Sequence, residues 1–156
     1  SQEYFIGNLM DYYIQKGKID EGLAQMDAVL AKNSTPYFMY VKGVLQYEKK
    51  DYDGAIATFN QIIAEGKDFV AEAYSKIGDC SFFPAQEIVE ENSKLSMKYA
   101  TNEAKIKELY EKAFPFYEKA KEAKPDNRQL WGQYLLNIYW KLDKEKYNAL
   151  EKELGY

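Results

Sequence analysis

Apolar residues recur three and four positions apart along most of the chain, and this spacing is typical of amphipathic α-helices. The pattern is clearest in residues 40–59, where a helix, a polar turn and a second helix follow one another. Gly43 stands on the first helix, and Ala55 and Phe59 share one face of the second. Asp51 ends the turn and can cap the second helix. The sequence therefore predicts a helical hairpin whose two helices approach closely at Gly43.

The same hairpin pattern recurs on both sides of this stretch. Gly78 lies 35 residues after Gly43. The residues of the second helix reappear as Tyr110, Ala113, Tyr117, Ala120 and Pro125, and an earlier copy contains Gly17, Ile19, Gly22, Met26, Val29 and Pro36. Because two short helices cannot bury their apolar faces alone, the recurrence predicts several hairpins that stack on one another.

Residue types that start and stop helices divide the chain further. We expect Asp20, Asp68 and Asp143 to cap helices, Pro36 to stand in the first turn of one, and Gly66 to end one. The expected helices include residues 4–15, a helix that contains Leu130 and Trp131, and a final helix that contains Tyr147 and Leu154. Thr101 is the expected restart after a bend around residues 92–102.

A period near 34 residues in units of helix, turn and helix resembles the tetratricopeptide repeat, most closely in residues 40–59 and 110–125. The resemblance implies an all-α fold, a right-handed superhelix of about four repeats. The predicted organisation is a single domain, 1–156, with repeats at about 3–35, 36–67, 69–124 and 126–154. An insertion near residues 80–102 lengthens both helices of the third repeat, and Pro84 and Pro115 fall inside these helices.

A narrower resemblance concerns residues 112–120, 124–127 and 142–147, which follow the long inserted hairpin. This arrangement looks like a group of bacterial tetratricopeptide-repeat proteins that are often exported and often carry further repeats upstream. The resemblance favours a periplasmic or exported location over a cytoplasmic one. The sequence starts at Ser1 and shows no signal peptide, and no apolar run is long enough to span a membrane.

Composition and motifs argue against an enzyme. The chain contains no histidine and one cysteine, Cys80, so the commonest general base and the usual zinc ligands are missing. The glycines are scattered singly and form no phosphate-binding loop. A net charge of −4 without a basic patch argues against nucleic acid as a partner. We therefore expect no catalytic residue, no metal site and no cofactor.

In the tetratricopeptide-repeat family, the first helix of each repeat lines a concave groove. The resemblance places these residues in that groove: Tyr4, Asn8, Asp11, Tyr37, Tyr40, Val41, Val44, Tyr47, Lys76, Asp79, Gln133, Tyr139 and Trp140. We expect Tyr37, Tyr40 and Val44 to be exposed there, since aromatic side chains are common interface anchors. An equally weighted alternative is that Tyr47, Phe83, Tyr139 and Trp140 pack against the lengthened third hairpin.

The charges at these positions indicate which partner would fit. Some family members hold a carboxyl-terminal carboxylate with basic residues, but only Lys76 is basic at the matching positions here. Acidic side chains on the same helices (Asp11, Glu48, Glu72 and Asp79) would repel an acidic tail. The predicted ligand is thus a neutral or basic, partly apolar peptide.

The sequence therefore predicts a non-catalytic scaffold that binds a peptide or partner segment in an aromatic-rich groove. Two alternatives remain open. One is a module for a small ligand such as a sugar or lipid, which would need stacked rings and convergent amides such as Asn8 with Gln133. The other is a structural carboxyl-terminal part of a longer repeat protein, which would show an apolar patch on the first helix.

Overall fold

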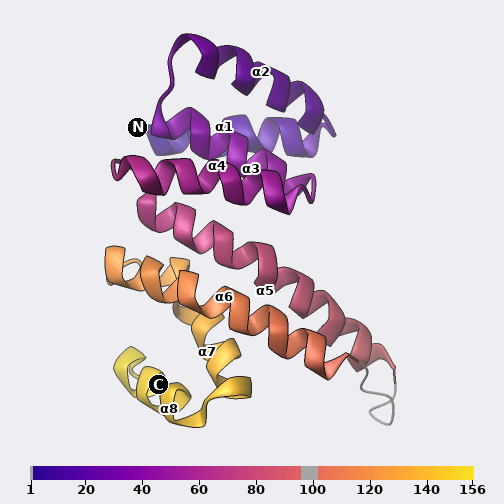
Figure 1. Cartoon of the computed structure of the whole chain (residues 1–156), viewed down its shortest axis with the longest axis vertical. Coiled ribbons are helices and arrows are strands. Elements are labelled where there is room, and N and C mark those ends of the chain that lie inside the picture. Colours follow the sequence, from indigo (N-terminus) through magenta and orange to yellow (C-terminus); the bar gives the residue numbers. More distant parts are fainter. Residues whose placement is uncertain (1, 96–101) are drawn as a thin grey trace. The chain divides into compact units, whose positions relative to one another are not determined.

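The computed structural model describes the backbone of residues 2–95 and 102–156, and the side chains from residue 8 onward within these ranges. The described residues form α-helices, one short 3-10 helix and no strand, which confirms the all-α prediction. They fall into two compact units, unit 1 (Ser1–Lys76) and unit 2 (Ile77–Tyr156), and the boundary lies inside one long helix (Figure 1). Each unit is described separately.

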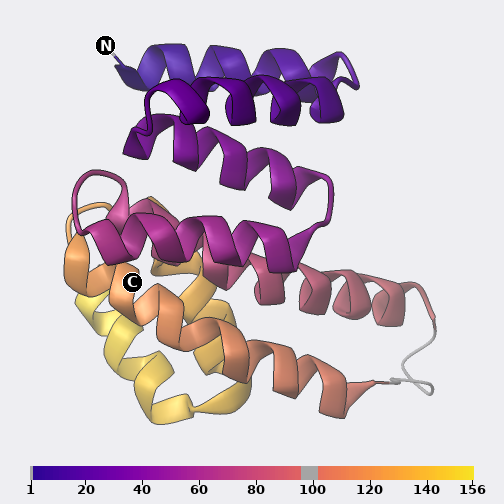
Figure 2. The same ribbon diagram turned by 45° about the horizontal axis from the view of Figure 1, so that its top comes forward.

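Unit 1 contains two helical hairpins and the start of a third. Its helices are α1 (Gln2–Gln15), α2 (Ile19–Lys32), α3 (Pro36–Glu48), α4 (Tyr52–Glu65) and the first residues of α5 (Val70–Lys94). In unit 1, α2 packs against α1 and α3, and α3 packs against α4 (Figure 2). The helix α3 packs against α1, α2 and α4, so it is the central helix of the unit.

Several helix ends of unit 1 follow from single residues, as the sequence predicts. The Asp51 side chain accepts a hydrogen bond of 3.0 Å from the Gly54 backbone N–H and caps α4. Pro36 stands at the first position of α3, behind the capping residue Thr35. Gly66 ends α4 in the left-handed conformation, with φ +64°.

Two capping predictions are wrong. The helix α2 begins at Ile19, so Asp20 already lies inside its first turn and contacts Lys49 at 2.6 Å instead of capping. The helix α5 begins at Val70, and Phe69 with φ +68° separates it from Asp68. In both places the helix boundary differs by one or two residues from the position that the sequence indicates.

The core of unit 1 forms where α3 meets its neighbours. The phenyl ring of Phe59 packs directly on Gly43, because a Cβ atom at Gly43 would lie only 2.5 Å from the ring carbon Cε1. On the other side of α3, Val41 and Leu45 pack with Tyr13 of α1 and with α2. These contacts confirm the predicted close approach at Gly43 and explain why α3 has little exposed surface.

Unit 2 contains the rest of α5, α6 (Glu103–Ala123), the 3-10 helix η2 (Arg128–Leu130), α7 (Gly132–Leu142) and α8 (Lys144–Leu154). The helices α5 and α6 have 25 and 21 residues and contain Pro84 and Pro115, which confirms the lengthened third hairpin. Residues 96–101, which include the expected restart at Thr101, lie outside the described residues.

The expected helix with Leu130 and Trp131 is corrected by the structure. A short 3-10 turn ends at Leu130, and α7 starts at Gly132. The Trp131 indole is buried between these elements and donates a hydrogen bond of 3.2 Å from Nε1 to the Lys124 carbonyl oxygen. The final helix α8 starts behind Asp143, whose side chain accepts from the Lys146 backbone N–H, as predicted.

Candidate peptide-binding surface

The structure sorts the residues predicted for the groove by their exposure. Asn8, Asp11, Gln133 and Trp140 are exposed; Tyr37, Tyr40, Tyr47 and Lys76 are half-buried; Val41, Val44, Asp79 and Tyr139 are buried. The side chain of Tyr4 lies outside the described residues. Only the first two groups can meet a partner without a change in the fold.

The prediction that Val44 is exposed is wrong, because only 5% of its surface is accessible. Val41 on the same helix is fully buried and belongs to the cluster that α3 forms with α1 and α2. The physical reason is the central place of α3, whose neighbours cover more than one face. Val44 is therefore covered although the sequence places it on the groove side of the helix.

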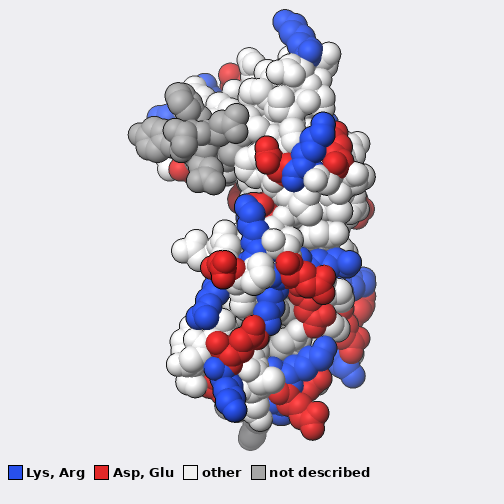
Figure 3. Space-filling model, turned by 90° about the vertical axis from the view of Figure 1, so that its left-hand side faces the viewer, with Lys and Arg blue, Asp and Glu red and all other residues white. Residues whose placement is uncertain are grey.

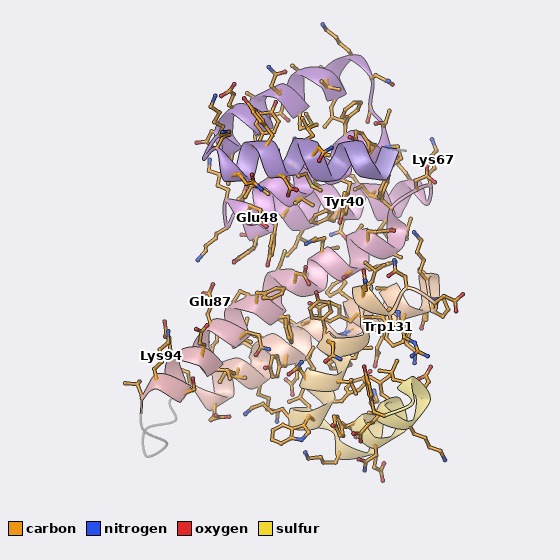
Figure 4. The ribbon with its side chains drawn as sticks, turned by 180° about the vertical axis from the view of Figure 1, so that it is seen from behind. Tyr40, Glu48, Lys67, Glu87, Lys94 and Trp131 are labelled. Carbon is orange, nitrogen blue, oxygen red and sulfur yellow. The ribbon has the colours of Figure 1, made fainter. Side chains whose placement is uncertain are left out.

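Tyr40 and Tyr37 are less accessible than the sequence suggests. The Tyr40 ring stacks on Phe69, with ring centres 5.2 Å apart, and also contacts Phe59 (Figure 4). The Tyr37 ring meets the edge of Phe38 and packs on the α1–α2–α3 cluster. Burial raises the pKa of the Tyr37 hydroxyl above its usual value. Both rings stabilise unit 1 and offer only their remaining edges to a partner.

The accessible part of the first-helix surface in unit 1 is polar and acidic. Asn8 and Asp11 are exposed on α1, and Glu48 is exposed at the end of α3 (Figure 4). Tyr47 lies half-buried near that end, and the Lys76 ammonium group is 5.2 Å from the centre of its ring. Tyr47 and Lys76 are therefore two predicted groove residues that the structure does bring together.

In unit 2, two of the predicted groove residues are structural. Asp79 is 3% exposed and accepts a hydrogen bond of 2.7 Å from the Tyr117 hydroxyl of α6. Tyr139 is buried, hydrogen-bonded to Glu118 and in contact with the ring of Phe114. Burial, with the nearby Glu118 carboxylate, raises the pKa of the Tyr139 hydroxyl well above its usual value. The alternative that Tyr139 packs against the third hairpin is thus correct.

Two other residues of α7 remain at the surface. Trp140 is 58% exposed, and the Lys144 ammonium group lies 3.9 Å from the centre of one of its rings. This geometry is favourable for a cation–π contact. The Gln133 amide donates a hydrogen bond of 3.4 Å to the hydroxyl of Tyr156. Asn8 belongs to unit 1 and Gln133 to unit 2.

The sequence did not point to Tyr134, which joins an aromatic cluster of unit 2. We define this cluster as Phe82, Phe83, Tyr117 and Tyr134. The Tyr134 ring stacks on Tyr117 with centres 4.7 Å apart, and it meets Phe82 and Phe83 at 5.2 and 6.1 Å with the rings nearly perpendicular. Phe83 is 38% exposed and Tyr134 is half-buried, so the cluster reaches the surface.

A depression of unit 2 lies between α6, α7 and α8 and encloses about 490 Å³. Leu135, Leu150 and Tyr139 contribute to its walls. Two contacts cross it from α6 to α8: Lys121–Glu153 at 2.6 Å, and Lys146–Glu118 at 3.4 Å. Figure 3 shows positive and negative side chains intermixed on this part of the surface. The lining contains three glutamates and two lysines, and both lysines lie within 4 Å of a glutamate.

The described residues offer little for catalysis or metal binding. They contain no group of three or more Asp, Glu, Cys or His side chains that could hold a metal ion. The Cys80 thiol is buried. None of the described helices is both long and apolar enough to cross a membrane.

Comparison with known proteins agrees with the first two hairpins. Residues 8–68 match the model of the tetratricopeptide-repeat family. This stretch covers α2, α3 and α4 and most of α1. Such repeats generally mediate contacts between proteins. No curated protein matches the chain.

Proposed function

Because residues 8–68 are tetratricopeptide repeats, we propose that the protein is a non-catalytic scaffold that binds a peptide or partner segment on its first helices. The repeat match is the observation that carries this proposal. In unit 1 the binding surface would comprise the exposed side of α1, the end of α3 and the start of α5. The polar residues of this surface are Asn8, Asp11 and Glu48, and the surface also includes the contact between Tyr47 and Lys76.

The charge of this surface favours a neutral or basic partner over an acidic tail. Asp11 and Glu48 are exposed, and Lys76 is held near the ring of Tyr47. Acidic peptides would meet like charges, which weakens association, whereas basic segments would gain attraction and faster association. The tyrosine edges would add apolar contact area of the kind found in many interfaces.

The direct test is affinity capture from extracts of the source cell, with the chain as bait, followed by measurement of Kd for each purified candidate. The informative variant is Asp11→Lys with Glu48→Lys, because both side chains are exposed and the core stays unchanged. A matched control is Asp53→Lys with Glu65→Lys, which reverses two exposed charges on α4. Far-UV circular dichroism would verify that all three proteins fold alike.

We expect a partner whose Kd rises at least about tenfold with the first variant and stays unchanged with the control. Equal loss with both variants would show only an effect of net charge. Unchanged binding with the first variant would place the contact outside the first helices of unit 1. Either result would overturn the proposed surface. Failure to bind any protein would overturn the scaffold function itself.

A further inference from the structure

The part of α5 that belongs to unit 2 has an unbalanced charge. Residues 77–94 contain Asp79, Glu87, Glu90 and Glu91 and a single lysine, Lys94, whose ammonium group lies 3.5 Å from the Glu90 carboxylate. Asp79, Phe83 and Glu87 are four residues apart and therefore share one face of the helix. Glu87 is exposed on α5 (Figure 4) and follows Phe83 by about one helical turn in the sequence. Along this face the exposed ring of Phe83 stands between the buried Asp79 and the exposed Glu87.

The neighbouring helix α7 completes the surface without adding a charge. Residues 132–140 contain no charged side chain. Lys141, the next residue, is 2.6 Å from the Glu103 carboxylate and is thereby paired. Tyr134 of α7 contacts Phe83, and its ring lies on that of Tyr117. Residues 132–140 of α7 therefore add no positive charge to the aromatic cluster.

One ring of this cluster is hydrogen-bonded to a buried acidic residue. The Tyr117 hydroxyl donates a hydrogen bond of 2.7 Å to Asp79 Oδ1. The pKa of the Tyr134 hydroxyl is raised, first because the residue is partly buried and second because of the nearby Asp79 charge. Because Asp79 is buried, solvent screens its field less than that of a surface charge. The Asp79 carboxylate therefore adds a negative contribution at Tyr134 of the cluster.

We propose that the aromatic cluster of unit 2 binds an arginine or lysine side chain that projects from an otherwise apolar partner segment. The faces of phenylalanine and tyrosine rings attract cations, and the carboxylates on α5 add to this attraction. An arginine can in addition stack its planar guanidinium on a ring. The inference rests on the proposed function, since it specifies one contact of a bound segment.

The test uses the full chain and a library of random twelve-residue peptides displayed on phage. Enriched peptides would be synthesised with a fluorescent label and an amidated carboxyl terminus, and Kd measured by fluorescence anisotropy. Each arginine of a binding peptide would be replaced by citrulline, which has nearly the same shape and no charge, and each lysine by acetyl-lysine. We expect enrichment of a cationic residue flanked by apolar ones, and a rise in Kd of at least about fivefold on neutralisation.

Two substitutions at equally exposed residues of α5 test whether the peptide cation contacts the aromatic cluster. Phe83 and Val89 are both 38% exposed on α5, but they lie on different faces of the helix. Phe83→Ala should raise Kd at least about fivefold for the cationic peptide and little for its neutral analogue, whereas Val89→Ala should change neither. Glu87→Gln should weaken only the cationic peptide, and the loss should shrink at high salt.

The outcomes separate this inference from the function on which it rests. Peptides that bind without a cationic residue, or that bind Phe83→Ala as well as the parent chain, would overturn the inference and leave the scaffold function intact. A failure of the library to yield any binder would overturn both. If the chain proves to be a dimer that Phe83→Ala dissociates, the cluster is a contact between two copies, and the inference is again wrong.

Discussion

The hairpin α3–α4 of unit 1 and the longer hairpin α5–α6 of unit 2 close on the same kind of contact. In each, a glycine of the first helix receives the ring of an aromatic residue of the second: Gly43 with Phe59, and Gly78 with Tyr117. A Cβ atom would lie 2.5 Å from the ring at Gly43 and 2.8 Å from it at Gly78. Neither distance is possible for a real side chain, so both helix pairs approach closely only because the residue is glycine.

The two contacts differ in polarity. Val44 follows Gly43, and the ring that packs on Gly43, that of Phe59, has no hydroxyl group. In unit 2 the residue after Gly78 is Asp79. The ring that packs on Gly78 is that of Tyr117, and its hydroxyl donates a hydrogen bond to Asp79. Both pairs are buried. The close approach of the two helices thus depends on the missing side chain of glycine. The polarity of the neighbouring residues can change, provided that a buried acceptor and its donor are present together.

The largest expected effect tests whether the two contacts are equivalent. Ala55 of α4 and Ala113 of α6 precede the contact ring by four residues, and both are fully buried. Replacing either alanine with tryptophan should lower the free energy of unfolding by about 4 kcal/mol, because an indole cannot fit between closely packed helices. Urea unfolding followed by circular dichroism measures this loss.

The matched control is Ala57→Trp, which places the same side chain at an exposed position of α4. It should leave the free energy of unfolding nearly unchanged. A large loss at Ala55 with a neutral result at Ala113 would show that the hairpins are not built on one plan.

The second prediction concerns the polar pair of unit 2. Tyr117→Phe would remove the donor to Asp79 and should destabilise unit 2 by about 1–3 kcal/mol. Asp79→Val would leave the tyrosine hydroxyl without this acceptor and should cost a similar amount. The double variant reproduces the polarity of the α3–α4 contact, so its loss should be smaller than the sum of the single losses by about 1 kcal/mol or more.

Tryptophan fluorescence can follow this experiment selectively, because both tryptophans, Trp131 and Trp140, belong to unit 2. Losses that simply add would mean that Asp79 and Tyr117 do not depend on each other. In that case the polarity of the contact would have another origin.

These contacts also show which parts of the structure could be predicted from the sequence. Asp51 and Gly66 act through local stereochemistry, so their roles follow from residue type and spacing. The length of the third hairpin follows from the distance between Gly78 and Ala113 along the chain. Such features require no knowledge of which helices are neighbours in space.

The candidate site was predicted less well because exposure depends on those neighbours. Val44 is apolar in a helix that has partners on several sides, and the sequence does not reveal how many faces they cover. Asp79 resembles a surface acid until the hydroxyl of Tyr117, 38 residues later, is brought to it. Tyr134 follows a 3-10 turn that the apolar pattern does not distinguish from a longer helix, and its contacts come from α5 and α6.

The third prediction compares the two glycines directly. Gly43→Ala and Gly78→Ala should each lower stability by about 1–2 kcal/mol, since the clash with a buried ring outweighs the better helix propensity of alanine. Gly132 of α7 serves as the control, because the nearest atom to an added Cβ there is 3.7 Å away. Gly132→Ala should leave stability unchanged or raise it by up to about 1 kcal/mol. If all three variants behaved alike, the contact geometry would not control the hairpins.

The smallest expected effect concerns the turn that leads into the unit 1 contact. Asp51→Ala would remove the side chain that accepts from Gly54 and should lower stability by about 1 kcal/mol. Asp51→Asn should retain most of this stability, because an asparagine oxygen can accept the same hydrogen bond. The measurement is the urea midpoint at constant slope.

Asp20→Ala is the informative control, since Asp20 is also an aspartate near a helix start but caps nothing and contacts an exposed Lys49. Exposed ion pairs of this kind contribute little, so no measurable change is expected. A loss at Asp20 as large as that at Asp51 would show that the turns are stabilised by charge rather than by the capping hydrogen bond. In that case a higher salt concentration would reduce the stability loss at both residues. A loss caused by the missing capping hydrogen bond would not depend on salt in this way.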